Sequence, residues 1–139
     1  MKRRWTITIG LGITLTGAVF ALSFQHTTTG AIESFPFAGG TGPGYVQIQQ
    51  ITLKPGESTG WHHHDGPSWV ILEKGHGVVE YEACGSTPLQ PGSAFAEPAR
   101  NVHKVDNFGP DAATIWWATV YPLGSTPIVP DEAAPTCGQ

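Results

Sequence analysis

Residues 56–75 read GESTGWHHHDGPSWVILEKG, and this stretch decides the fold. A histidine triplet lies between glycines, and the apolar run from Ser68 to Lys74 ends at Gly75. Short runs rich in β-branched and aromatic residues, bounded by glycine and proline, are typical of strands joined by tight turns. The stretch therefore predicts two short strands, Thr59 to His64 and Ser68 to Lys74.

The rest of the chain repeats this pattern, and no stretch has the periodicity of a long amphipathic helix. Further strands are predicted at Tyr45 to Leu53, Gly77 to Ala83, Ser93 to Glu97, Val102 to Asn107 and Thr114 to Tyr121, with a turn at Thr87 to Gly92. Short strands at this spacing predict an all-β sandwich or barrel.

The length of 139 residues fits a single domain. We expect the β-barrel to occupy residues 45–126, after a Thr-, Gly- and Pro-containing linker or loose arm at residues 24–44. Residues 127–139 are rich in proline and alanine and are predicted to form a C-terminal tail on the surface.

The histidine triplet is the strongest chemical signal. Side chains alternate between the two faces of a strand, so His62 and His64 point the same way and His63 points the opposite way. Two imidazoles on one face can chelate a metal ion, with His103 on a later strand as the third ligand. Neutral imidazole suits iron, manganese, nickel, copper and zinc. The triplet alone is equally compatible with a polar, solvent-facing strand.

Two spaced motifs around these histidines resemble those of the cupin superfamily. In the first motif Gly56, His62, His64 and Gly75 are in register, while Ser68 stands at the position of the family's glutamate. The second motif aligns four further residues, and Arg100 replaces its inner glycine; the aligned residues are Gly92, Pro98, His103 and Asn107.

This resemblance implies a double-stranded β-helix, or jelly-roll barrel, with one divalent metal ion bound by His62, His64 and His103. Because Ser68 replaces the carboxylate, it implies a three-histidine site, as in cupins that are thiol and diketone dioxygenases. A rival interpretation is that loss of the glutamate abolished metal binding and left a pocket for a small molecule. The function is therefore either a metal-dependent dioxygenase or a non-catalytic metal or small-molecule binding protein.

Other polar residues are candidates for the pocket. Gln47 and Gln49 lie on a strand that can line the interior of such barrels, and Ser68 would lie beside the metal ion. Glu97 could supply the missing carboxylate, although its position before Pro98 also suits an outward side chain.

The N-terminus has the pattern of a signal peptide or an uncleaved membrane anchor. Positive residues at positions 2–4 precede an uncharged, mostly apolar run from Trp5 to Phe24, and Ala21 and Ser23 suit cleavage after residue 23. Both interpretations export the domain, with any membrane contact restricted to residues 5–24; a buried core segment is the alternative. Cys84 and Cys137 then predict one disulfide tying down the tail, with two free thiols as the alternative.

The net charge of the chain indicates which classes of binding partner to expect. Without residues 1–23 the chain keeps four Lys and Arg against eleven Asp and Glu, a net charge of −7. Nucleic acid is not an expected partner, because neutralising phosphates requires clustered basic residues. We expect a small-molecule ligand, and a homodimer in which the arm exchanges between two copies remains open.

Overall fold

The computed structural model describes residues 23–130 and 132–137, apart from the side chains of Ser23, Phe24 and His26. Within these ranges the structure is entirely strands and connecting loops, and none of it forms a helix capable of crossing a bilayer. The predicted signal or anchor segment lies outside the described residues, apart from Ser23.

Ten strands form the described part of the chain. They are β1 (Ser23–Phe37), β2 (Gly40–Leu53), β3 (His62–His63), β4 (Ser68–Lys74), β5 (Gly77–Tyr81), β6 (Ser86–Leu89), β7 (Ala94–Glu97), β8 (His103–Asp106), β9 (Ala113–Pro122) and β10 (Val129–Pro130).

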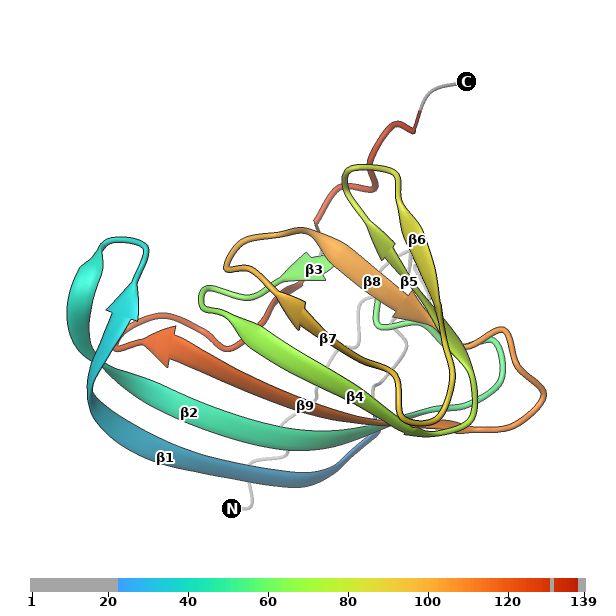
Figure 1. Cartoon of the computed structure of the whole chain (residues 1–139), viewed down its shortest axis with the longest axis horizontal. Helices are drawn as coiled ribbons and strands as arrows, with labels where there is room; N and C mark the ends of the chain where they lie inside the picture. Colours follow the sequence, from blue (N-terminus) through green and yellow to red (C-terminus); the bar gives the residue numbers. More distant parts are fainter. Residues whose placement is uncertain (1–22, 131, 138–139) are drawn as a thin grey trace, which may run out of the picture.

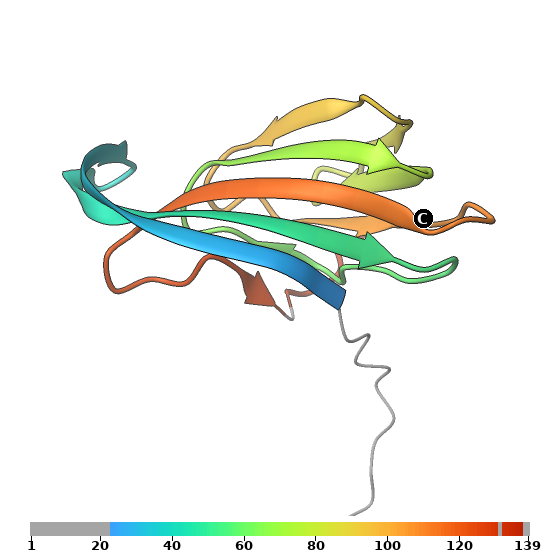
Figure 2. The same ribbon diagram turned by 90° about the horizontal axis from the view of Figure 1, so that it is seen from below.

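The strands build two antiparallel sheets that face each other (Figures 1 and 2). Sheet A has the order β1-β2-β9-β4-β7 and sheet B the order β10-β3-β8-β5-β6. Residues on β4 alternate between buried and exposed, which is the period of a strand with one face on a core. This two-layer arrangement confirms the predicted jelly-roll.

The interior between the sheets changes character along its length. On β2 the inward residues run from Leu53 and Ile51 to Gln49 and Gln47, so an apolar end gives way to a polar end. Both sheets supply the apolar core; its members include Leu53, Leu72 and Ile115 from sheet A and Val79, Leu89 and Val105 from sheet B. The polar end is where the histidines lie.

Residues 24–44 are not the linker or loose arm that the sequence predicted. They form most of β1 and the first part of β2, a long hairpin that projects beyond the barrel in Figure 1. The threonines at 27–29 pair with residues 47–49 of β2. Threonine is β-branched and suits a half-buried pleated surface, which outweighs its frequency in loops. Gly40, with φ of 128°, follows the turn.

A second difference lies at Thr87 to Gly92, predicted as a turn. Residues 86–89 form strand β6, and only the residues after Leu89 turn. Pro88 is tolerated because β6 is an edge strand, where one row of backbone groups needs no ladder partner. Strand β10 lies in the predicted tail and was not expected. The other strands were predicted within about five residues of their ends, and β4 has the predicted bounds.

The tail is tied to the body as the sequence predicted. A disulfide joins Cys84, in the turn between β5 and β6, to Cys137, with a sulfur–sulfur distance of 2.08 Å. Upstream of it β10 adds to the edge of sheet B by pairing with β3. The disulfide is compatible with an oxidising compartment.

Candidate metal centre

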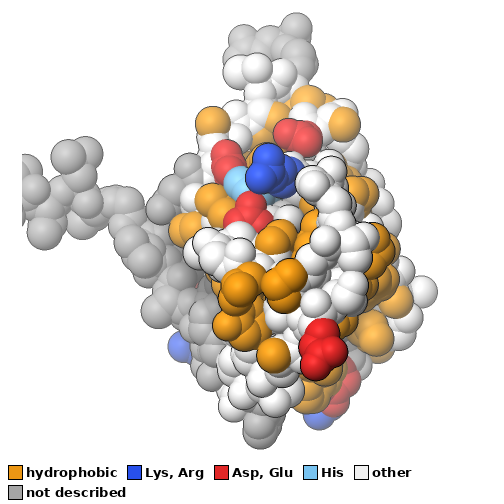
Figure 3. Space-filling model, turned by 90° about the vertical axis from the view of Figure 1, so that its left-hand side faces the viewer, with side chains coloured by type: hydrophobic (Ala, Val, Ile, Leu, Met, Phe, Trp, Pro, Cys, Tyr) orange, Lys and Arg blue, Asp and Glu red, His pale blue; other side chains and the backbone are white. Residues whose placement is uncertain are grey.

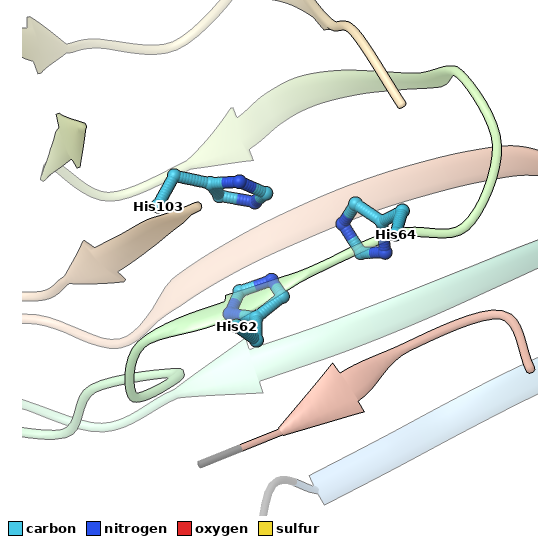
Figure 4. A group of neighbouring side chains, drawn as sticks. All are labelled: His62, His64 and His103. Atoms are coloured by element: carbon cyan, nitrogen blue, oxygen red, sulfur yellow. The ribbon is translucent and has the colours of Figure 1, made fainter. Parts of the chain in front are cut away.

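Three buried histidines converge at the polar end of the barrel (Figure 4). His62 on β3 is the direct cross-strand partner of His103 on β8, and His64 follows β3 in the chain. One ring nitrogen from each residue lies within 4.8 Å of the others. The side chains are 5%, 3% and 1% exposed for His62, His64 and His103. The structure thus brings together all three residues that the sequence singled out.

His63 points away from this group, as strand alternation predicts. Its Nδ1 contacts the Glu132 carboxylate at 2.5 Å, and its Nε2 lies 3.7 Å from Asp65 Oδ1. Arg100 approaches the same aspartate, with its Nε 3.9 Å from Oδ1. Figure 3 shows acidic, basic and histidine side chains gathered on one face beside a region of hydrophobic side chains. The His63 side chain is 16% exposed and belongs to an outer polar group with Glu132 and Asp65.

Each interior ring is held by a backbone carbonyl. Nδ1 of His62 lies 2.8 Å from the Gly60 oxygen, and Nδ1 of His103 lies 2.9 Å from the Asn101 oxygen. Nδ1 of His64 lies 2.8 Å from the Pro127 oxygen. A carbonyl can only accept, so each Nδ1 carries the proton and donates it. In the neutral rings the Nε2 lone pairs are left free, which is the arrangement of histidine ligands of metals.

Glu97 points inward and contacts two of the three rings, so the outward side chain considered from the sequence is not observed. It is 1% exposed, and its two oxygens lie 2.8 Å from His103 Nε2 and 3.2 Å from His64 Nε2. On β7 the inner-face residues are Phe95 and Glu97, so the carboxylate turns inward before Pro98 starts the next turn. Glu97 is also the direct cross-strand partner of Ser68. The carboxylate missing from position 68 is thus present on the neighbouring strand.

Burial and neighbouring charges shift the pKa values of His62 and Glu97. Burial, together with the charge of His103, lowers the pKa of His62 to about 3, so this ring is neutral near pH 7. Burial alone would raise the pKa of Glu97, but hydrogen bonds and charge from His103 and His64 outweigh it and lower this pKa to about 2. The carboxylate is therefore ionised.

The donor and acceptor balance at this centre calls for a cation. With Nδ1 protons given to carbonyls, Nε2 of His64 and His103 can donate to the Glu97 oxygens only when these rings are protonated. If the rings were neutral, two acceptors would face each other. Neither Glu97 oxygen has another hydrogen-bond donor, and both are buried. A divalent ion would satisfy the nitrogen and carboxylate lone pairs together, whereas protonated rings would bury charge in an apolar interior. The residues present fit a metal ion.

The cavity beside the centre is small and has mostly apolar walls. Its volume is about 30 Å³. Beyond the four polar site residues it is lined mainly by aliphatic side chains and Trp117; the others are Ile51, Thr59, Val70, Val105, Ile115 and Ile128. The Trp117 ring lies 4.7 Å from that of His64 at an angle of 30°. At roughly 10–15 Å³ for each water-sized species, such a cavity holds about two.

The three pocket candidates from the sequence are all buried. Ser68 is 0% exposed, Gln47 8% and Gln49 9%, on the inner face of sheet A. Across the sheet Gln47, Thr119, Ser68 and Glu97 form one continuous row of paired residues. This row forms the polar end of the interior beside the three histidines. Of its members, Glu97 also lines the cavity.

Comparison with known proteins agrees with this geometry. A family profile described as a cupin domain matches residues 49–119. A cupin-like protein from Thermotoga maritima superposes with a TM-score of 0.53 at 21% identity, covering 66% of this chain and 67% of its own. A cupin superfamily protein from Desulfitobacterium hafniense gives 0.51 at 18%, covering 69% and 78%.

One similar fold belongs to an enzyme. The DMSP lyase DddQ from Ruegeria pomeroyi superposes with a TM-score of 0.55 at 14% identity, and the match covers 61% of this chain but 42% of the lyase. At this identity the likeness concerns the fold alone. The search of curated proteins found no match.

Proposed function

Because the chain belongs to the cupin family, we propose that it is a metal-dependent dioxygenase acting on a small molecule. His62, His64 and His103 hold one divalent ion through Nε2, and Glu97 is the fourth ligand. Iron, manganese, nickel, copper and zinc all accept this donor set, and geometry rather than affinity selects among them. The proposal rests on one observation: three Nδ1-protonated rings converge with their ligand atoms within 4.8 Å of one another, and two of them contact the buried carboxylate of Glu97.

A bound divalent ion supplies Lewis acidity and a template on which dioxygen and a substrate meet. The chain's own contribution is to fix the four ligand side chains and to exclude water. Isoleucine and valine side chains from both sheets and the Trp117 ring surround the open side of the centre. In the reaction both atoms of dioxygen enter the organic substrate, which is the reductant, so no further electron donor is required.

The cavity limits the substrate. Its volume of about 30 Å³ has to accommodate the ion and the atoms bound to it. No Lys or Arg is among the lining residues, so a charged group on the substrate would find its partner only at the metal. We therefore expect a short, mostly apolar compound of which only one or two donor atoms enter the cavity, such as a small diketone or thiol.

We further propose that the domain works outside the cytoplasm. The charged and then apolar residues 2–24 favour export, and the Cys84–Cys137 disulfide suits an oxidising compartment. A homodimer is also part of the proposal, because β1 is an edge strand with unpaired backbone groups along one side. Size-exclusion chromatography with light scattering tests the dimer.

The second candidate function is a metal or small-molecule binding protein without turnover. The small cavity favours it, as does a lining in which the only acid–base groups are the four site residues. The dioxygenase and a metal-binding protein both require an ion, a small-molecule binding protein does not, and only the dioxygenase consumes oxygen.

Metal analysis followed by oxygen uptake separates these functions. Protein purified from an exporting host should contain one ion per chain, and after loading with iron, manganese, nickel or copper it should consume oxygen with a small diketone or thiol. Loading with zinc, which has no redox chemistry, is the control and should give no oxygen uptake. A flavonol is the bulkiest substrate of the test panel. Stoichiometric metal without oxygen consumption would establish the binding protein instead, and protein that takes up no metal after reconstitution would exclude both metal-dependent functions.

A further inference from the structure

The three interior rings are not held in the same way. His62 and His103 donate to carbonyls two residues earlier in their own segments, those of Gly60 and Asn101. His64 donates to the carbonyl of Pro127, 63 residues away. Two rings are therefore oriented locally, while the third depends on the C-terminal segment, which we define as residues 127–137.

We infer that the C-terminal segment is a positioning element of the metal centre, which orients His64 and is retained there by the Cys84–Cys137 disulfide. The expected effect on metal affinity rests on the proposed function. The orientation of the ring is a property of the protein itself.

Several contacts place this segment against the ligand strand. Val129 and Pro130 of β10 pair with His63 and His62 of β3. Beyond β10, the Glu132 amide donates to the Trp61 carbonyl at 3.1 Å, and its carboxylate contacts His63. The segment thus runs antiparallel to the residues that carry two of the ligands.

The same segment closes the cavity. The side chain of Ile128, next to the carbonyl that holds His64, is one of the cavity walls. Departure of the segment would both free the Nδ1 proton of a buried ring and admit water beside the Nε2 atoms. An unpaired buried donor is costly, so the His64 ring would turn toward another partner.

The noncovalent contacts of the segment are too few to keep it ordered against β3 by themselves. The disulfide therefore contributes to holding the segment in place. Its ladder with β3 consists of two residue pairs, and most residues from 133 to 137 are exposed. Ordering a backbone costs roughly 1–2 kcal/mol per residue, more than so short a ladder returns. The bond to Cys84, in the turn between β5 and β6, confines the segment near sheet B and reduces that loss.

The full chain with both Cys84→Ser and Cys137→Ser tests the inference, with two readouts. The first is proton NMR of the metal-free protein, following solvent exchange of the three Nδ1 protons. We expect faster exchange or loss of the signal at His64, with His62 and His103 unchanged. These two rings are the matched control, because their carbonyl partners do not belong to the C-terminal segment.

The second readout is the affinity for zinc or cobalt, measured by competition with a chelator. Loss of a group that orients a ligand costs roughly 10–100-fold in metal affinity, and we expect a decrease of this size. An unchanged His64 proton would overturn the inference, and so would equal loss at all three rings, since the disulfide would then support the whole domain. If wild-type protein binds no metal, the proposed function fails, while the NMR readout still decides the positioning of His64.

Discussion

Sheets A and B differ in the regularity of their ladders and in the number of site residues that they carry. In sheet A, β2 and β9 form an unbroken ladder of ten residue pairs, from Gly44–Pro122 to Leu53–Ala113. In sheet B, the ligand strand β3 has one ladder pair with β8 and two with β10. Yet sheet B or its flanking loop carries all three histidines, while sheet A contributes Glu97 at its edge.

The difference shows how a strand with few ladder pairs can hold metal-binding side chains in place. Backbone bonds outside the ladder reinforce β3: the Gly56 amide donates to the Asn107 carbonyl, and the Thr59 amide donates to that of Val105. The Arg100 amide donates to the carbonyl of His64 at 2.7 Å. Ligand placement in sheet B therefore depends on individual contacts, whereas the shape of sheet A depends on a regular ladder that tolerates single changes.

The largest expected effect is loss of metal after a ligand in sheet B is removed. Alanine at His62, His64 or His103 should each lower metal affinity more than 100-fold, beyond the roughly 10–100-fold typical of residues that only orient ligands. His63→Ala is the matched control and should stay within about threefold, because its ring faces Glu132 and Asp65. Equal losses at all four positions, measured by chelator competition, would mean that the cluster acts through fold stability.

The next effect tests the contribution of sheet A. Glu97→Gln keeps the shape of the side chain and an oxygen that can still bind, but removes its charge. We therefore expect a smaller loss of metal affinity than at the histidines, of roughly 10–100-fold, similar to that of residues that orient ligands. Because Ser68 and Glu97 are direct cross-strand partners, the exchange of Ser68→Glu with Glu97→Ser should recover most of this loss.

The single substitution Ser68→Glu is the control for this exchange, since it adds a carboxylate without removing one. If the exchanged variant binds metal no better than Glu97→Gln, then a carboxylate at position 68 does not reach the ion.

Much of this arrangement could be predicted from the sequence, because it depends on local spacing. The triplet of histidines fixes two ligands on one face through strand alternation, and the second motif adds His103. The inward turn of Glu97 could not be predicted, since the residue before a proline can end a strand on either face. The signal that could have revealed it is alternation along Ala94 to Glu97, where Phe95 marks the inner face.

The contribution of the C-terminal segment was also beyond the sequence. Residues 127–137 have the composition of a surface tail, and their pairing with β3 depends on where the chain returns after β9. Residues 24–44 were misinterpreted for a related reason. Their threonines form a strand because they pair with β2, and the composition of the segment does not indicate this pairing. Long-range pairing decided both cases.

A third prediction concerns the link between the sheets. Asn107 is fully buried at the end of sheet B, and its amide nitrogen donates to the carbonyl of Leu53 in sheet A and to that of Asp111. Its side-chain oxygen accepts from the Gly109 amide at 2.9 Å. Asn107→Ala should lower the free energy of unfolding by roughly 2 kcal/mol, because the buried Leu53 carbonyl loses its partner.

Chemical denaturation of the metal-free protein measures this effect. Asn101→Ala is the matched control, because the amide of Asn101 makes one long, exposed contact of 3.5 Å with Glu82. Equal destabilisation by both substitutions would contradict a special role of Asn107 between the sheets.

The smallest effect concerns the backbone of the loop that supports His64. Arg100 has φ of 64°, in the left-handed region where a residue with a Cβ is strained by roughly 1–2 kcal/mol. Its side chain is 78% exposed and lies 3.9 Å from Asp65, an ion pair that contributes little. Arg100→Gly relieves the strain but increases the entropy of the unfolded chain, so we expect a net stabilisation of about 0.5 kcal/mol.

Arg100→Ala separates these two contributions, since it removes the ion pair and keeps the Cβ, and it should leave the unfolding free energy nearly unchanged. If the glycine variant were less stable than the alanine variant, the strain at this position would be too small to matter. Individual backbone hydrogen bonds, from the Arg100 amide to His64 and from the Asn101 amide to Pro98, would then hold the loop, as single contacts rather than a regular ladder hold the ligands of sheet B.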